Sequence, residues 1–537
     1  MEPKIKRSLQ KIKNHVDNFC IKKIGPTFFS HARRTPHKQA IWCEGKTASY
    51  QELAQLVCRW SNAMHAKGVK RGDHIGVILP NSIEFVALIL VAADLGAVLV
   101  PLNTSLTRSA VHRAFEAADV KHVVSTAAIL KNILALNSEI DFSTTDFSIV
   151  NGLWLSVDDA IDGAVLLADL LHSIALDVPP VNAASEEDAF ILTMTSGSTG
   201  DPKPIILSQC TKFNRVIAAV ALYDITEHDK ILAATPLYHS LAERLVLIPL
   251  LTGGTSVLMC KFTAITWLQC VAEQAITFTI AVSSQLKQIS EELGDDNYSY
   301  HIDSLRCIVS SSALLDHHVK SDLLKKFNCK FHECYGASEI AIASNMSDIV
   351  TETQLRSVGI AAPGVDIKII GKNDEILGCE NVGEIICKTP MLFGGYFKRS
   401  DLTRAAMWGE YFRTGDLGKL DEYGFLYYLG RTKDIIISGG INIYPVDIET
   451  VVNAHVSVTE SAAFAFPDER LGEVIAIAVV ISNKSEFDLR TLRFHCCNHL
   501  ADFQQPRKFF IIDALPKNSM GKILKFELIK TFVNNAF

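Results

Sequence analysis

The sequence lacks the cysteine pairs and the surplus of basic residues that mark several classes of protein. Its 13 cysteines are scattered and none stands in a CxxC pair, which argues against a zinc site and favours free, mostly buried thiols in a reducing compartment. The formal net charge is −7, whereas nucleic-acid-binding domains are usually basic. We therefore expect no nucleic-acid partner and no bound structural zinc.

Long apolar runs are also scarce. The most apolar stretch extends from Phe85 to Leu102, but it contains Asp94 and Pro101, and a membrane span needs about 20 predominantly apolar residues. We interpret it as a buried helix, a break at Gly96 and a core strand. The basic N-terminus has no continuous apolar segment of the kind found in secretory signals. We expect a cytoplasmic protein, either soluble or peripheral at a membrane.

The first residues of the chain form a basic amphipathic pattern. Apolar residues recur at helical spacing between Ile5 and Phe19, with lysines and an arginine around them. Such a helix can lie on an anionic membrane surface. Docking on its own domain is the default interpretation, and contact with a membrane is the alternative. We treat residues 1–25 as a separate amphipathic N-terminal helix.

The rest of the chain has the pattern of an α/β protein with more than one domain. With 537 residues, of which 48% are hydrophobic and 21% charged, it is too long for a single core. Strand-length apolar runs such as 74–80 and 122–127 alternate with helical patterns, which predicts largely parallel sheets flanked by helices. Near Arg431 the pattern changes to strand, Gly-Gly turn, strand and helix, with Pro445 in the first helical turn. We predict a large domain over 26–432 and a small α+β domain over 433–537.

One stretch, TMTSGSTGDPKPIILSQ (193–209), combines glycines, hydroxyl groups and a lysine. Glycines let backbone N–H groups converge on phosphate oxygens, hydroxyl groups add donors, and lysine adds a positive charge. The spacing of Gly197, Gly200 and Lys203 does not fit the G-x-x-x-x-G-K-[ST] loop of many nucleotide-binding proteins. A strand is expected before the loop and a helix after it. Taken alone, the stretch fits a solvated loop as well as a phosphate site.

Four further motifs favour the phosphate site. They are YGASE (335–339), RTGD (413–416), GRTKDIIISGGINIYPVDIE (430–449) and LPKNSMGK (515–522). In this order and at these intervals, the chain resembles the adenylate-forming superfamily, which includes acyl-CoA synthetases, luciferases and peptide-synthetase adenylation domains. The resemblance covers nearly the whole chain. It implies that a carboxylate reacts with ATP to release pyrophosphate, and that a thiol then attacks the acyl-adenylate. Such chemistry depends on positioning and on neutralising charge.

The resemblance also implies roles for particular residues. The loop from Thr195 to Lys203 would hold the β- and γ-phosphates, and Glu339 with Thr195 would bind Mg²⁺. Lys522 would stabilise the negative charge that develops between the attacking carboxylate and the α-phosphate. The implied nucleotide- and CoA-binding residues are Thr195, Ser196, Gly197, Ser198, Thr199, Gly200, Lys203, Tyr335, Gly336, Ala337, Ser338, Asp416, Arg431, Lys433, Gly439 and Gly440.

Several of these residues would contact the adenine, the ribose or the α-phosphate of the nucleotide. Tyr335 would present its ring to the adenine. Asp416 would accept hydrogen bonds from the ribose hydroxyls, and Arg431 would reach the ribose or the α-phosphate. Ser338 stands where many members of the superfamily have threonine, and the hydroxyl is kept.

The resemblance further implies a moving small domain. Lys433 falls at the hinge between the two domains. After adenylation the small domain would rotate, so that Lys522 leaves the site and the loop with Gly439 and Gly440 enters to line a thiol tunnel. Glycines leave room there for the thin pantetheine arm. A plain hairpin turn explains the same pair of glycines, and the two interpretations are compatible.

The identity of the acid stays open. His239, which we count among the catalytic residues with Lys522, Glu339 and Thr195, corresponds to a position that borders the acyl pocket. The aspartate with which amino-acid-activating members hold an ammonium group is missing nearby. His239, Glu243 and Arg244 are similar to the H-x-x-E-R motif of long-chain acyl-CoA synthetases, with one extra residue; a solvated helix face is the alternative. Medium-chain, long-chain and aryl acids all remain candidates.

Three further hypotheses stand beside an acyl-CoA ligase that uses ATP, Mg²⁺ and CoA. A stand-alone ligase could load an acyl-carrier protein, which presents the same pantetheine thiol. A non-catalytic binding protein would be expected to have lost Lys522, Glu339, Asp416 or the loop, and all are intact. A light-emitting oxygenase on the same fold is the last alternative.

Overall fold

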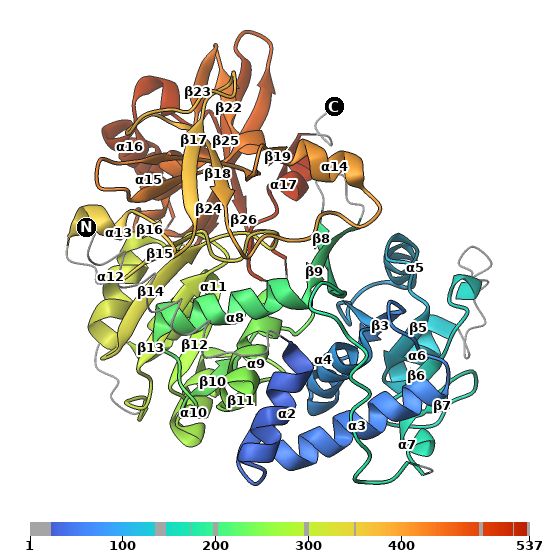
Figure 1. Cartoon of the computed structure of the whole chain (residues 1–537). Helices are drawn as coiled ribbons and strands as arrows, with labels where there is room; N and C mark the ends of the chain where they lie inside the picture. Colours follow the sequence, from blue (N-terminus) through green and yellow to red (C-terminus); the bar gives the residue numbers. More distant parts are fainter. Residues whose placement is uncertain are drawn as a thin grey trace.

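The computed structural model describes residues 23–134, 147–172, 174–196, 202–294, 300–347, 351–482, 487–518 and 520–533. These residues form a large α/β body and a smaller C-terminal unit that sits over one side of it (Figure 1). The described strands make four sheets, with nine, seven, five and five strands. The predicted amphipathic helix of residues 1–25 falls almost wholly outside the described residues, and the exact domain limits given above remain predictions.

The nine-stranded sheet is parallel through its centre. In spatial order its strands are β16 (Ile360–Ala361), β15 (Ser344–Met346), β14 (Lys330–Tyr335), β13 (Cys307–Ser311), β12 (Phe278–Val282), β10 (Lys230–Ala233), β11 (Thr255–Leu258), β1 (Gln39–Cys43) and β2 (Lys46–Ser49). All neighbours from β1 to β14 pair in parallel, whereas β2, β15 and β16 join antiparallel at the edges. The carboxyl ends of the central strands therefore meet along one edge, where α/β proteins usually bind their ligands.

The seven-stranded sheet confirms the strands predicted at 74–80 and 122–127. Its order is β7 (Val165–Leu166), β6 (Trp154–Ser156), β5 (His122–Ser125), β3 (His74–Ile78), β4 (Val98–Pro101), β8 (Ala189–Ser196) and β9 (Pro202–Ser208). Before β4, Gly96 takes a left-handed conformation with φ 70°, as the predicted break requires. The antiparallel edge strand β9 was not predicted, because Pro202 and Pro204 indicate a loop; edge strands tolerate such prolines.

Helices pack between and around these two sheets. The main hydrophobic core joins residues of both sheets to α2 (Ile24–Arg34), α3 (Tyr50–Ala66), α4 (Ile83–Leu95), α8 (Gln209–Tyr223) and α9 (Ser240–Thr252). The other described helices of the large body are α5 (Arg108–Ala117), α6 (Ala127–Leu134), α7 (Leu167–Leu170), α10 (Ala264–Gln274), α11 (Ser283–Leu293), α12 (His317–Lys326), α13 (Glu352–Leu355) and α14 (Ser400–Ala405). No helix in the described part of the chain is both long and apolar enough to cross a membrane.

Two antiparallel-rich sheets complete the fold. One contains β17 (Asp366–Ile370), β18 (Gly383–Lys388), β20 (Tyr411–Leu420), β19 (Met407–Trp408) and β21 (Leu426–Arg431). The other belongs to the C-terminal unit and contains β23 (Ile441–Ile443), β22 (Ile436–Ser438), β25 (Gly472–Ile481), β24 (Val458–Asp468) and β26 (Lys508–Ile512), with α15 (Pro445–Asn453), α16 (Leu489–His499) and α17 (Lys525–Phe532). The predicted strand, Gly-Gly turn, strand and helix are confirmed, with Pro445 in the first turn of α15.

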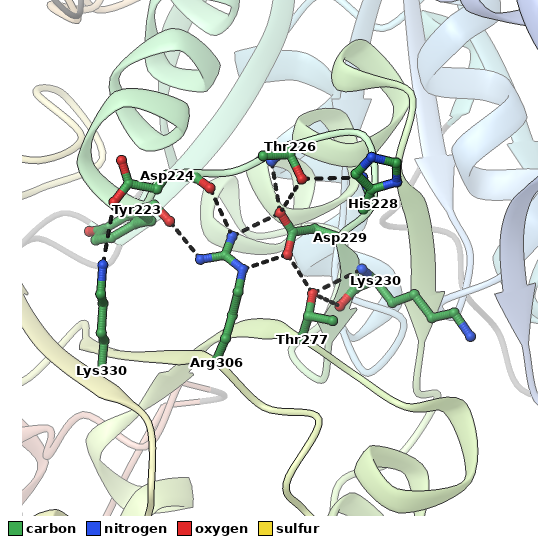
Figure 2. A network of polar contacts seen from close by, with 9 residues as sticks. All are labelled: Tyr223, Asp224, Thr226, His228, Asp229, Lys230, Thr277, Arg306 and Lys330. Atoms are coloured by element: carbon green, nitrogen blue, oxygen red, sulfur yellow. Dashed lines mark hydrogen bonds and ion pairs between the residues drawn. The ribbon is translucent and has the colours of Figure 1, made fainter.

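A polar network locks the amino ends of three neighbouring strands of the nine-stranded sheet (Figure 2). Asp229, just before β10, accepts hydrogen bonds from both Nε and Nη2 of Arg306, at 2.7 and 2.8 Å, and from the Thr277 hydroxyl at 2.6 Å. Arg306 and Thr277 directly precede β13 and β12. Burial opposes ionisation of Asp229, but these donors outweigh it and lower its pKa. The network fixes the relative positions of β10, β12 and β13.

Removing the cation of this network should destabilise the fold. We expect Arg306→Leu to lower the free energy of unfolding by about 2–3 kcal/mol, because the buried Asp229 carboxylate loses its bidentate partner. Arg399→Leu is the control, since Arg399 forms an exposed pair with Asp401, which should contribute little to stability. Urea denaturation measures both, and equal losses would contradict the assignment.

Candidate active site

A cavity of 1840 Å³ lies where the C-terminal unit faces the carboxyl edge of the nine-stranded sheet. Three groups of residues line it. The large body contributes Thr193, Met194, Lys203, Arg215, His239, Ser240, Leu241, Arg244, Ser311, Ser312 and Gly336–Glu339, the segment between the domains contributes 427–434, and the C-terminal unit contributes Asn518, Met520 and Lys522–Phe526, among others. Predicted site residues from motifs far apart in the sequence thus surround one space.

Asp416 forms the buried electrostatic centre of one end of this region. It lies opposite Arg431 in the β20–β21 ladder, and its Oδ2 accepts a 2.7 Å hydrogen bond from the Tyr335 hydroxyl. Arg431 Nε lies 2.8 Å from Oδ1, but the N–H is not aligned with that oxygen, which accepts no hydrogen bond. Burial raises the pKa of Asp416, against the opposing effects of Arg431, Tyr335 and Lys522. Oδ1 therefore keeps an unused acceptor position.

Tyr335 does not line the cavity, although its ring was predicted to contact the adenine. Its side chain is buried, its hydroxyl is bonded to Asp416, and its ring packs 5.8 Å from that of Tyr428. Tyr428 is among the residues that line the cavity, and Tyr335 is behind them. The sequence analysis did not identify Tyr428. It lies in β21, three residues before Arg431, and no motif feature separates it from an ordinary strand residue.

Lys522 reaches the same end from the C-terminal unit. Burial lowers its pKa most and Arg431 lowers it further, while Asp416 and Asp434 raise it. The turn that carries it is held by Asn518, whose Oδ1 accepts the backbone N–H of Lys522 at 3.0 Å. Gly521 has φ +74°, and a Cβ there would lie 2.1 Å from Oγ of Ser284 in α11. Glycine thus allows the turn to approach the large body closely enough to insert Lys522.

Glu339 also lines the cavity. Its Oε1 accepts a 3.1 Å hydrogen bond from the Tyr396 hydroxyl. The YGASE segment is held from below by Arg215, which donates to the carbonyl oxygens of Ser338 at 2.9 Å and Glu339 at 3.1 Å. Arg215 and Tyr396 were not identified from the sequence. The only signal for Arg215 was a charged residue within an otherwise apolar helical pattern.

The glycine-rich loop is described at its two ends. Thr195 and Ser196 end strand β8, and Thr195 pairs with Lys203 of β9 across the hairpin. Lys203 lines the cavity. Gly197, Ser198, Thr199 and Gly200 lie outside the described residues. Of the described ends of this segment, Thr193, Met194 and Lys203 line the cavity.

His239, the residue before α9, lines another part of the cavity wall. Burial lowers the pKa of its imidazole to about 4, so the ring is neutral at pH 7. Ser240, Leu241 and Arg244 continue the wall along one face of α9. Glu243 and Arg244 are both buried, and the interpretation of this segment as a solvated helix face is therefore wrong. Every residue of α9 from Leu241 to Leu251 is buried.

Gly439 and Gly440 are away from the cavity. They form the exposed turn between β22 and β23, where the Gly439 N–H donates to the Leu471 carbonyl at 2.9 Å. Lys433 lies in the short 3-10 turn Thr432–Asp434 that links β21 to β22, and it borders the cavity. In this structure the Lys522 face of the C-terminal unit faces the site, and the Gly-Gly turn does not.

The fold and the cavity together define an adenylate-forming enzyme architecture: a large α/β domain whose sheet edge is closed by a small domain that inserts a lysine. Two family models match the chain in the same arrangement. The AMP-binding enzyme model matches residues 28–397, and the AMP-binding enzyme C-terminal domain model matches residues 447–522. The protein belongs to the AMP-binding enzyme family.

Similar proteins cover nearly the whole chain. The long-chain-fatty-acid–CoA ligase FadD13 of Mycobacterium tuberculosis is 30% identical over 94% of this chain and 97% of its own length. The 2-succinylbenzoate–CoA ligase of Bacillus cereus is 29% identical over 92% and 96%. Among solved structures, ATP-bound MatB from Rhodopseudomonas palustris has a TM-score of 0.86 at 26% identity and covers 96% of this chain and 100% of its own. The o-succinylbenzoate CoA synthetase of Bacillus subtilis with its acyl-adenylate gives 0.81 at 26%, over 94% and 97%.

The charges around Lys522 predict how its protonation responds to substitution. Arg431→Met should raise the pKa of Lys522 toward its ordinary value, because a neighbouring positive charge is removed. Arg413→Met is the control, since Arg413 also lines the cavity but pairs with Glu384 at 2.6 Å. Competitive amine labelling of Lys522 as a function of pH, read by mass spectrometry, measures both. A downward shift in Arg431→Met would contradict the electrostatic assignment.

Proposed function

We propose that the protein is an ATP-dependent acid–thiol ligase, which converts a carboxylic acid to an acyl-adenylate and then to an acyl-CoA. The observation that carries this proposal is the insertion of Lys522 beside Asp416 and Arg431, in one cavity with Glu339 and His239. A non-catalytic binding protein would have no need of a lysine inserted at that position. The similarity to named CoA ligases over nearly the full length supports the same conclusion.

The ATP site would extend from the β8–β9 hairpin to Asp416. The loop 195–203 would receive the β- and γ-phosphates through backbone N–H groups, hydroxyl groups and Lys203. Asp416 Oδ1 has the unused acceptor position that a ribose hydroxyl could fill. Gly336–Ser338 would border the adenine, and Tyr335 would act behind them by holding Asp416. Arg431 would contact the ribose or the α-phosphate.

Glu339 and Thr195 would hold a magnesium ion. Tyr396 occupies one acceptor position of the Glu339 carboxylate, and a carboxylate has further lone pairs to offer. One or two carboxylates or hydroxyls together with phosphate oxygens suit Mg²⁺, which keeps much of its water. Such an ion would neutralise charge on the phosphates.

In the first half-reaction a carboxylate oxygen of the acid attacks the α-phosphorus, and the bond to the bridging oxygen of pyrophosphate breaks. Both reactants are anions, so the barrier includes their repulsion. Lys522 would reduce it by placing an ammonium group between the carboxylate and the α-phosphate. His239 is neutral, so we assign it to the wall of the acyl site, where it orients the acid without adding charge.

In the second half-reaction a thiolate attacks the acyl carbon, AMP leaves with the carbon–oxygen bond electrons, and the thiol proton is released. We propose that rotation about Lys433 withdraws Lys522 and brings Gly439 and Gly440 to the thiol path. Both glycines are exposed and have positive φ values of 57° and 84°. CoA is the proposed acceptor because the named relatives are CoA ligases. An acyl-carrier protein presents the same thiol and is the alternative.

Replacing the inserted lysine should separate the two half-reactions. We expect Lys522→Ala to reduce acid-dependent pyrophosphate release by about 100- to 1000-fold, the cost of losing one preorganised charge in a transition state. Thioester formation from a preformed acyl-adenylate and CoA should fall far less. Lys517→Ala is the control, because Lys517 is in the same motif but pairs with Glu460; it should stay within about twofold. Equal effects on both half-reactions would refute the role of Lys522.

We also propose a cytoplasmic location, with the first 25 residues docked on the protein itself. Liposome co-sedimentation of the full-length chain and of a form that starts at residue 24 tests this. Docking predicts equal and weak binding by the two forms to anionic vesicles. Stronger sedimentation of the full-length chain, reversed by salt, would instead establish peripheral membrane contact through this segment.

A further inference from the structure

Four ionisable side chains are buried together behind the acyl end of the cavity. Lys212 and Arg215 come from α8, and Glu243 and Arg244 come from the adjacent α9. Their exposed fractions are 1%, 2%, 0% and 7%. Three of these groups are bases and one is an acid. Buried charges normally occur in balanced pairs, because an unpaired charge in a dry interior is costly.

The partners of Lys212 and Arg215 are accounted for within the protein. Lys212 forms an ion pair with Glu243 and a 3.3 Å hydrogen bond to Ser240 Oγ. Arg215 donates to the carbonyl oxygens of Ser338, Glu339 and Met391. Glu243 is therefore already neutralised by Lys212, and Arg215 is satisfied by neutral acceptors.

Arg244 is different. Within the described residues it makes no hydrogen bond and no ion pair, and its Nε is buried without a partner. The positive charge of Arg244 also reaches Arg215: burial and then Arg244 lower the pKa of Arg215 to about 9. The cluster thus holds a surplus of positive charge, and its guanidinium at position 244 lacks a counter-ion.

Arg244 borders the cavity on the same face of α9 as Ser240 and Leu241. From His239 to Arg244 the helix advances by about 7 Å, which places Arg244 deeper in the acyl end. The charged groups that dominate around Lys522 are Arg431, Asp416, Asp434 and Lys433. Arg244 is not among those groups, and its charge acts instead on Lys212 and Arg215, so Arg244 lies in a different part of the cavity from Lys522.

We propose that the acid substrate carries a second carboxylate, which binds the Arg244 guanidinium while the first carboxylate reacts beside Lys522. This inference rests on the proposed ligase function and specifies its substrate class: a dicarboxylic acid, aliphatic or aryl, with a spacer of a few carbon–carbon bonds. The planar guanidinium suits a carboxylate because two parallel N–H groups can bind its two oxygens. Ser240 supplies a hydroxyl next to this position, and Leu241 supplies apolar wall for the spacer.

The same arrangement would disfavour an acid that ends in a methyl group. Such an acid would leave the Arg244 charge buried without a partner and without water. Sites built to bind a charged or hydrogen-bonding group reject analogues that lack it far more strongly than apolar pockets reject a methylene. Selection for diacids would thus come as much from this rejection as from the new contact.

Matched pairs of acids test the proposal. Acid-dependent pyrophosphate release is measured for dicarboxylic acids of three to eight carbons, for the corresponding monocarboxylic acids, and for the monoamides of the diacids. Wild type is compared with Arg244→Met, Arg244→Lys and Leu241→Met. For the best length we expect the wild-type kcat/KM to favour the diacid by at least about 100-fold, and Arg244→Met to reduce that ratio by about 100-fold or more.

Two variants separate charge from shape. Arg244→Lys keeps the charge without the planar fork and should retain part of the diacid preference. Leu241→Met alters the same wall without changing charge and should move the diacid and the monoacid alike. Arg244→Met should unfold at a urea concentration no lower than wild type, because it replaces an unpartnered buried charge by an apolar side chain.

The outcomes distinguish this inference from the ligase function. If monoacids release pyrophosphate and are favoured at every length, the ligase function stands and the diacid inference is overturned. An equal loss for diacids and monoacids in Arg244→Met would also overturn it, since Arg244 would then act on the reacting carboxylate or on the fold. Calorimetry provides an independent readout. If no acid is turned over but diacids bind wild type and not Arg244→Met, the inference stands without the ligase function; no binding and no turnover would overturn both.

Discussion

The electrostatic environment of Asp416, which is paired with Arg431 and influenced by the charge of Lys522 from the small domain, is the feature on which the site depends. Arg431 faces Asp416 across a β-ladder and remains with it wherever the C-terminal unit lies. Lys522 comes from that unit and adds its charge only when the turn around Gly521 rests against Ser284. Asp416 would still contact Arg431 and the Tyr335 hydroxyl after Lys522 is withdrawn, so its buried carboxylate would not be left without a partner. The proposed domain rotation would therefore meet no large electrostatic barrier at this contact.

In the nine-stranded sheet, the polar network that stabilises the fold lies at the amino ends of the strands, and the residues that border the cavity lie at the carboxyl ends. At the amino ends, Asp229, Thr277 and Arg306 bind one another in a closed network of satisfied groups. At the carboxyl ends, the segments after β13 and β14 and the start of α9 border the cavity. Parallel pairing places all amino ends on one side and all carboxyl ends on the other. The polar groups on the site side can then remain partly unsatisfied, because the fold is held from the other side.

The sequence permitted prediction of those parts of the fold that depend on local chemistry. The left-handed residue Gly96, the turn at Gly439 and Gly440 and the start of α15 at Pro445 each follow from the conformational preference of one or two residues. The motifs of the site could be recognised by their order. Strand β9 could not, because its prolines indicate a loop unless the strand is known to lie at a sheet edge.

The burial of Glu243 and Arg244 could not be predicted from the sequence either, because it depends on tertiary packing. Charged residues at the start of a helix usually face water, and only the packing of α9 against α8, α2 and the strands β10 and β11 takes that option away. The environment of Tyr335 is a similar case. Its hydroxyl meets Asp416 from a motif 81 residues later in the chain, and no spacing within either motif encodes that contact.

Overall similarity and pocket chemistry give different information about the acid. The chain is about equally similar to a ligase named for long-chain fatty acids and to one named for 2-succinylbenzoate, so identity over the whole length does not select between them. That identity reflects the shared fold and the shared nucleotide chemistry, which are independent of the acyl group. In the proposed arrangement the acid would meet only the cavity residues around His239 and Arg244. A buried cation in that part of the cavity should weaken the binding of a neutral acyl tail more than many substitutions elsewhere. A neutral tail displaces the water around the cation without supplying a negative charge or a hydrogen bond in its place. The substrate class is therefore better inferred from the unpartnered Arg244 than from the closeness of any relative.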